Sequence, residues 1–254
     1  MPRKTERFGW VPDLPDQRDH MFAAPMAQLG PLPAATDLRA KCPPVYDQGQ
    51  LSSCTANAIS AAIQFDRMKQ KLPNFMPSRL FIYFNERAME GTVKSDSGAQ
   101  IRDGIKSVSK EGVCPEPDWP YVPSKFDQKP SAKAFKDAVL DRAVSYQRLV
   151  QTLSQLRGCL ASGYPFVFGF TVYDGFESPA VAKSGHASLP ASTEKVVGGH
   201  AVMAVGYDDA HQRFVVRNSW GPAWGMKGYF TLPYAYVTQA SLASDFWTVR
   251  LVGK

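Results

Sequence analysis

Residues 47–60 read DQGQLSSCTANAIS, and in this stretch a turn-forming segment runs into an alanine-rich one at Cys54. From Cys54 to about Lys71 the apolar residues recur at helical spacing, which predicts a core helix that begins at the cysteine. The free N–H groups and the positive dipole end of a helix N-terminus stabilise a thiolate, which is the reactive form of cysteine. The stretch therefore suits a nucleophile, and it equally fits a small buried cysteine with no chemical role.

The segments on either side predict an α+β fold. Two more helices are expected, one in residues 77–89 with Ser78 as its N-cap and Gly91 at its end, and one in residues 97–112 that stops at Gly112. A further helix is expected at residues 152–163, and short strands rich in Val, Phe and Tyr follow at residues 165–173, 200–208, 213–220 and 228–234. Runs of helices followed by runs of strands predict a mainly helical lobe over about 32–122, a mainly β lobe over about 123–254, and a cleft between them.

Two segments lack regular patterning. Residues 1–31 are rich in Pro, Asp and Arg, which predicts an extended arm that either lies on the body of the protein or is disordered. Phe8 and Trp10 are conspicuous in this otherwise polar arm. Residues 177–199 are small and polar and predict a long, mobile loop at the rim of the cleft.

Composition excludes several classes of protein. The 254 residues are 44% hydrophobic and carry a formal charge of 29 − 23 = +6, but no run of Lys and Arg suggests a nucleic-acid partner or a membrane surface. No apolar stretch approaches the roughly 20 residues that cross a bilayer. The sequence has no secretory signal pattern, and it leaves the compartment open between secreted or periplasmic and cytoplasmic. We expect a monomer without a cofactor.

The four cysteines are too few for a disulfide-stapled scaffold, and none has the spacing of a zinc site, so we expect no metal. They are Cys42, Cys54, Cys114 and Cys159. Cys42 and Cys114 each lie beside a proline near a turn, and the sequence leaves open whether they form a disulfide or remain free thiols.

A catalytic thiol needs a base, and the chain has four histidines. His20, His186 and His211 lie in polar or small-residue segments and are expected at the surface. His200 follows two glycines and opens an apolar strand, which would carry its ring into the interior. Asn218 ends a later strand, where its amide could fix one imidazole nitrogen and leave the other toward a thiol.

Three motifs together indicate a family. DQGQLSSCTA, GGHAVMAVGY and VRNSWGPAWG resemble, in that order, the motifs of the papain-like cysteine peptidases over about residues 32–251. The spacings agree, with 200 − 54 = 146 residues between cysteine and histidine and 218 − 200 = 18 between histidine and asparagine. The resemblance implies a two-lobed papain-like fold, with a helical lobe, an antiparallel β-sheet or barrel lobe, and the active site in the cleft between them.

The resemblance also implies roles for particular residues. Cys54 would be the nucleophile, His200 its partner, Asn218 the orienting amide and Gln48 a donor to the oxyanion. The residues that would line the substrate site are Gly98, Ser52, Gly169, Ala201, Trp220 and Asp245, of which Trp220 would shield the histidine and Asp245 could accept a basic substrate residue.

The implied function is a cysteine endopeptidase that cleaves protein or peptide substrates through a thiolate–imidazolium pair and a thioester. Protein inhibitors of the cystatin type would be further partners. Two alternatives remain open: an inactive or weakly active homologue that binds peptides, and an enzyme that transfers the acyl group to an acceptor other than water.

The chain departs from the family pattern near the cysteine. Leu51 stands where a disulfide-forming cysteine is usual, Ser52 replaces a glycine and would be strained if that position required positive φ, and Thr55 replaces an aromatic residue. The arm is too short for the usual helical prosegment. We expect residues 1 to about 31 to lie along or near the cleft as a short prosegment.

Overall fold

The computed structural model describes residues 8–17, 19, 21–22 and 31–253. Residues 1–7, 18, 20, 23–30 and 254 lie outside this description, so it covers neither His20 nor much of the arm. The described helices are α1 Cys54–Lys69, α2 Arg79–Glu90, α3 Ile101–Glu111, α4 Ala132–Ala138, α5 Leu153–Ala161, α6 Pro179–Ser184 and α7 Tyr234–Thr238. The described strands are β1 Met21–Phe22, β2 Ala35–Asp37, β3 Arg142–Leu149, β4 Phe166–Tyr173, β5 Val196–Asp208, β6 Arg213–Arg217, β7 Tyr229–Pro233 and β8 Ala243–Gly253.

The predicted helices begin and end for the expected reasons. The Ser78 hydroxyl accepts a hydrogen bond from the Phe81 N–H at the start of α2, and Gly91 ends that helix in the left-handed conformation. Gly112 follows the last residue of α3. The predictions of α1 from Cys54 and of α5 are also confirmed.

The strands form one sheet in the order β1-β3-β8-β4-β5-β6-β7, and β2 pairs with β5 on the side. All pairings are antiparallel except the short one between β1 and β3. The sequence patterns indicated β4 to β7 but gave no prediction for β3 or β8. Strand β8, near the end of the chain, lies between β3 and β4 in the sheet.

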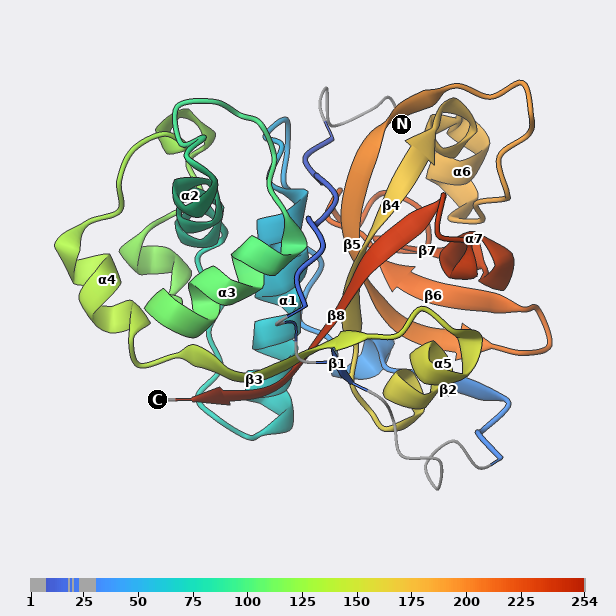
Figure 1. Ribbon diagram of the computed structural model, residues 1–254, viewed down its shortest axis with the longest axis horizontal. Helices are drawn as coiled ribbons and strands as arrows, with labels where there is room; N and C mark the ends of the chain where they lie inside the picture. The colour runs from blue at the N-terminus through green and yellow to red at the C-terminus, as the bar shows by residue number, and fades with distance from the viewer. Residues whose placement is uncertain (1–7, 18, 20, 23–30, 254) are drawn as a thin grey trace.

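The helices α1 to α4 gather on one side of the molecule and the sheet with α5 to α7 on the other (Figure 1). Helix α4 follows the expected lobe boundary at about residue 122 but packs against α2, with the rings of Phe135 and Phe81 4.9 Å apart. Helix α1 is buried along almost its whole length and packs against β5 and β8, so Cys54 lies where the two halves meet.

The structure corrects one expectation about an irregular segment and answers the open question about the cysteines. Residues 177–199 are not one loop, because Ser178 caps α6, Gly185 ends it, and β5 already begins at Val196. Cys42 and Cys114 do not form a disulfide, and all four cysteines are free thiols.

Candidate active site

Cys54 is the first residue of α1, and its side chain is completely buried. The thiol sulfur accepts hydrogen bonds from the Ala201 N–H, at 3.4 Å, and from the Gly9 N–H of the arm. Ala201 follows His200 on β5, so the sulfur lies beside the strand that carries the histidine. The structure therefore brings the Cys54 sulfur into contact with the strand residue that follows His200, 147 positions away in the sequence.

His200 is also completely buried, as the apolar strand predicted. Its Nε2 atom is 2.9 Å from the Asn218 Oδ1 atom. Its Nδ1 atom is buried and has no hydrogen-bond partner in the described part of the chain. The Asn218 contact leaves Nδ1 as the nitrogen available to a thiol, although the described residues include no hydrogen bond between Nδ1 and the Cys54 sulfur.

Trp220 stacks on the His200 ring, with ring centroids 4.9 Å apart and an interplanar angle of 28°. The indole covers the imidazole next to its bond with Asn218, which keeps water from competing for that bond. The other described histidines differ: His186 and His211 are exposed, as expected from their segments. His211 pairs with Asp208, and His186 lies 3.2 Å from the Thr231 hydroxyl.

Gln48 is fully buried and fixed at both ends of its side chain. Its Oε1 atom accepts a hydrogen bond from the Ser219 hydroxyl at 2.6 Å, and its Nε2 group donates to the Leu51 carbonyl at 2.9 Å. The amide nitrogen carries two protons, so a second donor remains for a ligand. Ser219 lies inside the quoted NSW motif, but the sequence gave no reason to assign it this contact.

The substitutions next to the cysteine are accommodated without backbone strain. Ser52 is not among the described non-glycine residues with positive φ. Its N–H donates to both carboxylate oxygens of Asp96, at 3.1 and 3.2 Å, and this contact joins two segments between which no disulfide exists. Thr55 donates its hydroxyl to Glu86, at 2.6 Å, where an aromatic side chain was expected from the family.

The arm enters the site between the helices and the sheet (Figure 1). Trp10 forms a parallel bridge with Ala99: the Ala99 N–H donates to the Gly9 carbonyl at 2.7 Å, and the Val11 N–H donates to the Ala99 carbonyl at 3.0 Å. On the other side, the Trp10 N–H donates to the Gly199 carbonyl at 3.0 Å. The arm therefore bridges the two halves of the molecule.

Glycines make this close approach possible. A Cβ atom on Gly9 would lie 1.7 Å from the Ser52 carbonyl oxygen, and one on Gly98 would lie 2.1 Å from the Gly9 carbonyl oxygen. Gly98 thus lies against an extended segment, as the resemblance implied, but its neighbour Ala99 makes the backbone hydrogen bonds.

The Trp10 ring fills a pocket on the sheet side. Cβ atoms on Gly169 and Gly199 would lie within 1.9 and 2.7 Å of the ring, so both glycines leave the space that it occupies. The Trp10 Nε1 atom donates to the Asp245 carboxylate at 3.1 Å, and Arg148 pairs with the same carboxylate at 3.2 Å. Gly169 and Asp245, both predicted to line the substrate site, therefore lie around the same ring. Gly199 and Arg148 also lie there, but the sequence had not assigned them to the site.

The backbone explains how Asp245 reaches this pocket. Asp245 adopts φ 60° within β8, beside a break in the register between β4 and β8. A bulge of this kind turns a side chain away from its regular direction. The sequence placed Asp245 only approximately, because a register break on a strand leaves no mark in a residue pattern.

Acidic residues of the arm continue the contact beyond the pocket. Asp13 accepts hydrogen bonds from the Arg102 backbone N–H at 3.1 Å and from the Trp247 indole at 2.8 Å. Burial and the nearby Asp245 carboxylate raise the pKa of Asp13 to about 6. Asp19 pairs with Arg102 and Arg148, at 2.9 and 3.0 Å.

Burial changes the acid–base properties of Cys54 and His200. It raises the pKa of the Cys54 thiol to about 12, partly offset by the hydrogen bonds from Ala201 and Gly9. It lowers the pKa of His200 to about 4, although the bond to Asn218 acts in the opposite direction. Both shifts favour the neutral forms of the thiol and the imidazole.

Two further findings concern other classes of site. In the described residues, no group of three or more His, Cys, Asp or Glu side chains is arranged to hold a metal ion. The same part of the chain contains no helix with the length and apolar character needed to cross a membrane.

Comparison with known proteins identifies the family. The family model described as papain family cysteine protease matches residues 32–248. The structure of xylellain, a cysteine protease from Xylella fastidiosa, is 43% identical and superposes with a TM-score of 0.91 over 98% of both chains.

Two sequence relatives extend the comparison. A peptidase C1-like protein of Acanthamoeba polyphaga mimivirus is 41% identical over 98% of this chain and 88% of the viral protein. Bovine pro-cathepsin H is 29% identical over 80% of this chain, which spans 60% of the bovine protein's length. The chain belongs to the papain family of cysteine proteases.

Proposed function

We propose that this protein is a cysteine endopeptidase in which Cys54 attacks the peptide carbonyl and His200 transfers the proton. The observation that carries the proposal is the His200 ring, held by Asn218 at 2.9 Å through Nε2 and unpaired at its buried Nδ1, beside the strand residue whose N–H contacts the Cys54 sulfur. A thiol paired with an oriented imidazole is the common requirement of thiol-based acyl transfer.

The reaction follows from these groups. Cys54, with its proton on His200, attacks the carbonyl carbon and forms a C–S bond, and the π electrons move to the oxygen. Collapse of this tetrahedral intermediate breaks the C–N bond, and His200 gives its proton to the leaving amine. Water then attacks the thioester with His200 as the base, which releases the carboxylic acid and restores the thiol.

The second amide proton of Gln48 and the backbone N–H of Cys54 are the proposed donors to the oxyanion. The first N–H groups of a helix have no partner within the helix, which leaves the Cys54 N–H available to a ligand. Removal of one such donor typically lowers turnover by about 10²–10³. Asn218 keeps the imidazole in one tautomer, and Trp220 excludes water from that contact.

We further propose that the arm is an inhibitory prosegment. The Gly9 N–H donates a hydrogen bond to the Cys54 sulfur, so the arm occupies the space beside the thiol that a substrate would need. Phe8 adds an edge contact to the His200 ring, with centroids 6.0 Å apart. The burial of both catalytic groups keeps them neutral, and displacement of the arm would restore solvent and allow the charged pair.

The pocket that holds Trp10 is the proposed site for the second substrate residue on the acyl side of the cut. It offers a flat apolar space against Gly169 and an acceptor in Asp245. Tryptophan and tyrosine would fill the space and donate to the carboxylate, and arginine or lysine would add charge to the same contact. Because Arg148 already pairs with Asp245, we expect aromatic residues to be preferred over basic ones.

The test is hydrolysis of fluorogenic peptides with Trp, Tyr, Arg or Ala at that position, by the full chain and by a Gly9→Val variant that displaces the arm. Cys54→Ala and His200→Ala in the same background are the matched controls. Hydrolysis that needs both residues, together with single labelling of Cys54 by an epoxysuccinyl peptide, is the expected result.

Other outcomes distinguish the alternatives. Peptide binding without turnover or labelling would refute the proposal and favour a binding homologue. Aminolysis of a peptide ester much faster than its hydrolysis would instead indicate acyl transfer to another acceptor.

A further inference from the structure

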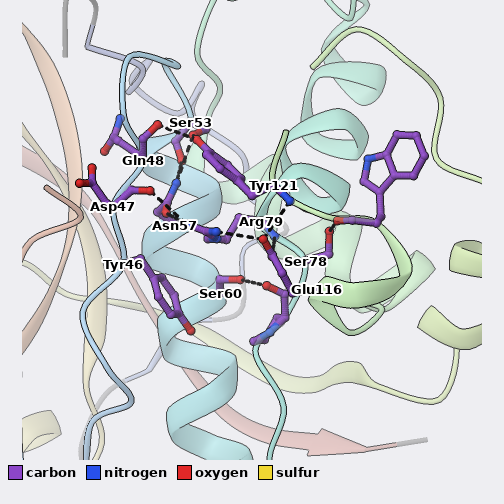
Figure 2. A network of polar contacts seen from close by, with 12 residues as sticks. Tyr46, Asp47, Gln48, Ser53, Asn57, Ser60, Ser78, Arg79, Glu116 and Tyr121 are labelled. Atoms are coloured by element: carbon purple, nitrogen blue, oxygen red, sulfur yellow. Dashed lines mark hydrogen bonds and ion pairs between the residues drawn. The ribbon is translucent and has the colours of Figure 1, made fainter. Parts of the chain in front are cut away.

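A buried polar network lies behind the site, on the side of the helices (Figure 2). Its centre is Arg79, the first residue of α2, which is 8% exposed. The Arg79 Nη2 atom pairs with the Glu116 carboxylate at 2.9 Å, and its guanidinium lies 4.1 Å from the centre of the Tyr121 ring. Glu116 also accepts the Tyr121 backbone N–H at 3.0 Å, so the ion pair fixes this tyrosine.

The network reaches the backbone on both sides of the proposed oxyanion donor. The Tyr121 hydroxyl donates to the Gln48 carbonyl at 2.9 Å. The Arg79 Nη1 atom donates to the carbonyl of the preceding residue, Asp47, at 3.2 Å. Together with the Ser219 hydroxyl on the side chain, these bonds hold Gln48 from its main chain and from its amide.

The same network reaches the residue before the nucleophile. Because the single Tyr121 hydroxyl proton goes to Gln48, the Ser53 hydroxyl, 2.5 Å away, must donate to Tyr121. Ser53 in turn accepts from the Asn57 amide at 3.1 Å, and the Asn57 oxygen accepts from Arg79 at 3.4 Å. A chain of hydrogen bonds thus runs from the guanidinium to the Gln48 carbonyl, and each group in it donates to the next. The bonds of such a chain strengthen one another in a buried setting.

The Ser53 hydroxyl takes part in this network in place of ordinary helix capping. Serine at an N-cap position usually accepts a backbone N–H of the first helical turn through its hydroxyl. Here the Ser53 side chain makes no cap hydrogen bond, although it occupies the N-cap of α1. The hydroxyl belongs to the network instead, so one set of contacts joins the loop of Gln48 to the turn of Cys54.

We propose that Arg79 and Tyr121 are positioning residues that set the oxyanion donor of Gln48 against the turn that carries Cys54. The inference rests on the proposed peptidase function. Neither residue contacts substrate in this role. They act by fixing the distance between the Gln48 amide, which donates to the oxyanion, and the sulfur that forms the bond, and small displacements of such donors reduce transition-state stabilisation.

The experiment is performed on the full chain in the Gly9→Val background, in which the arm is displaced. Tyr121→Phe removes only the hydroxyl. Tyr207→Phe is the control, because the Tyr207 hydroxyl also donates to a backbone carbonyl, that of Pro33 at 2.7 Å, away from the site.

For Tyr121→Phe we expect kcat to fall about tenfold with KM unchanged, and the inhibition constant of a peptide aldehyde to rise by a similar factor. An aldehyde adduct carries an oxyanion, whereas alkylation by iodoacetamide does not, so the alkylation rate should stay within about twofold. Arg79→Lys retains the charge beside Glu116 but not the fork of donors, and it should lose kcat in the same pattern.

Epistasis supplies the second readout. Tyr121→Phe should cost nothing further once Gln48→Ala is present, because its effect passes through Gln48. The inference is overturned if Tyr121→Phe matches Tyr207→Phe, if it slows alkylation as much as turnover, or if the two losses multiply. No peptide hydrolysis by the Gly9→Val chain with an intact network would instead refute the peptidase function itself, and the positioning role with it.

Discussion

Gly9→Val is the most direct perturbation of the arm. The Cβ atom at this position would lie 1.7 Å from the Ser52 carbonyl oxygen, which is backbone and cannot move aside as a flexible side chain could. Real Cβ atoms do not approach so closely, so the arm must leave its position. The substitution adds an isopropyl side chain to the arm and changes none of the proposed catalytic side chains.

The size of the effect follows from the contacts that the displacement breaks. Three backbone hydrogen bonds hold residues 9 to 11, and each contributes about 0.5–1.5 kcal/mol. The Trp10 ring, which is 9% exposed, adds roughly 4–6 kcal/mol for an aromatic side chain of about 150–250 Å². Because residues 9 to 11 cannot occupy the docked position in the variant, we expect this docking free energy, about 5–10 kcal/mol in sum, to be lost and the arm to be open in most Gly9→Val molecules.

The assay compares peptide turnover and the rate of Cys54 alkylation in the full-length chain and in the variant. Both rates should rise by the same factor until the arm is open in most molecules. Gly253→Val is the matched control, since a Cβ there meets no atom within 4 Å. Equal rates in the wild-type and Gly9→Val proteins, with unchanged thermal unfolding, would refute the reasoning that the arm closes the site.

Three further results are expected. Burial raises the pKa of Cys54 to about 12 and lowers that of His200 to about 4, so the alkylation rate of the wild-type chain should be slow at neutral pH and rise about tenfold per pH unit. The alkylation rate of Gly9→Val should be faster at neutral pH and should change less between pH 6 and 8. Identical slopes of rate against pH in the two proteins would contradict this. Asp245→Asn in that background should lower kcat/KM about tenfold for peptides with Arg in the proposed pocket and less for Trp, as a peptide series would show; equal losses for Arg and Ala would count against the assignment. Asn218→Ala should lower kcat about tenfold or more by releasing the imidazole, measured by steady-state kinetics, and full activity of this variant would remove Asn218 from the mechanism.

The sequence predicted the local features well. Ser78 and Gly91 mark the ends of α2 because a hydroxyl and a residue without a side chain satisfy the backbone at helix ends, and this chemistry depends only on neighbouring residues. The proposed catalytic residues were also found from the sequence, because each lies in a short motif whose order along the chain is characteristic. The pairing of His200 with Asn218 was expected on these grounds, and the structure contains it.

Contacts between distant segments were not accessible in this way. Asp245 reaches the pocket because its own backbone adopts the left-handed conformation beside a register break. Arg148, which pairs with Asp245, lies on a strand that the residue pattern did not reveal. Tyr121 and Arg79 meet Gln48 from two other segments, and neither lies in a motif. Side chains of this kind are placed by packing, and packing depends on the whole fold.

The sequence by itself thus determined the family, the helices around Cys54 and the identity of the groups that could do chemistry. The tertiary structure decided their state: an arm whose Gly9 can approach Ser52 closely, and whose Trp10 fits between Gly169 and Asp245, buries the thiol and the imidazole together. The physical reason is desolvation. Burial favours the neutral forms of the thiol and the imidazole, and only the fold determines how much water reaches them.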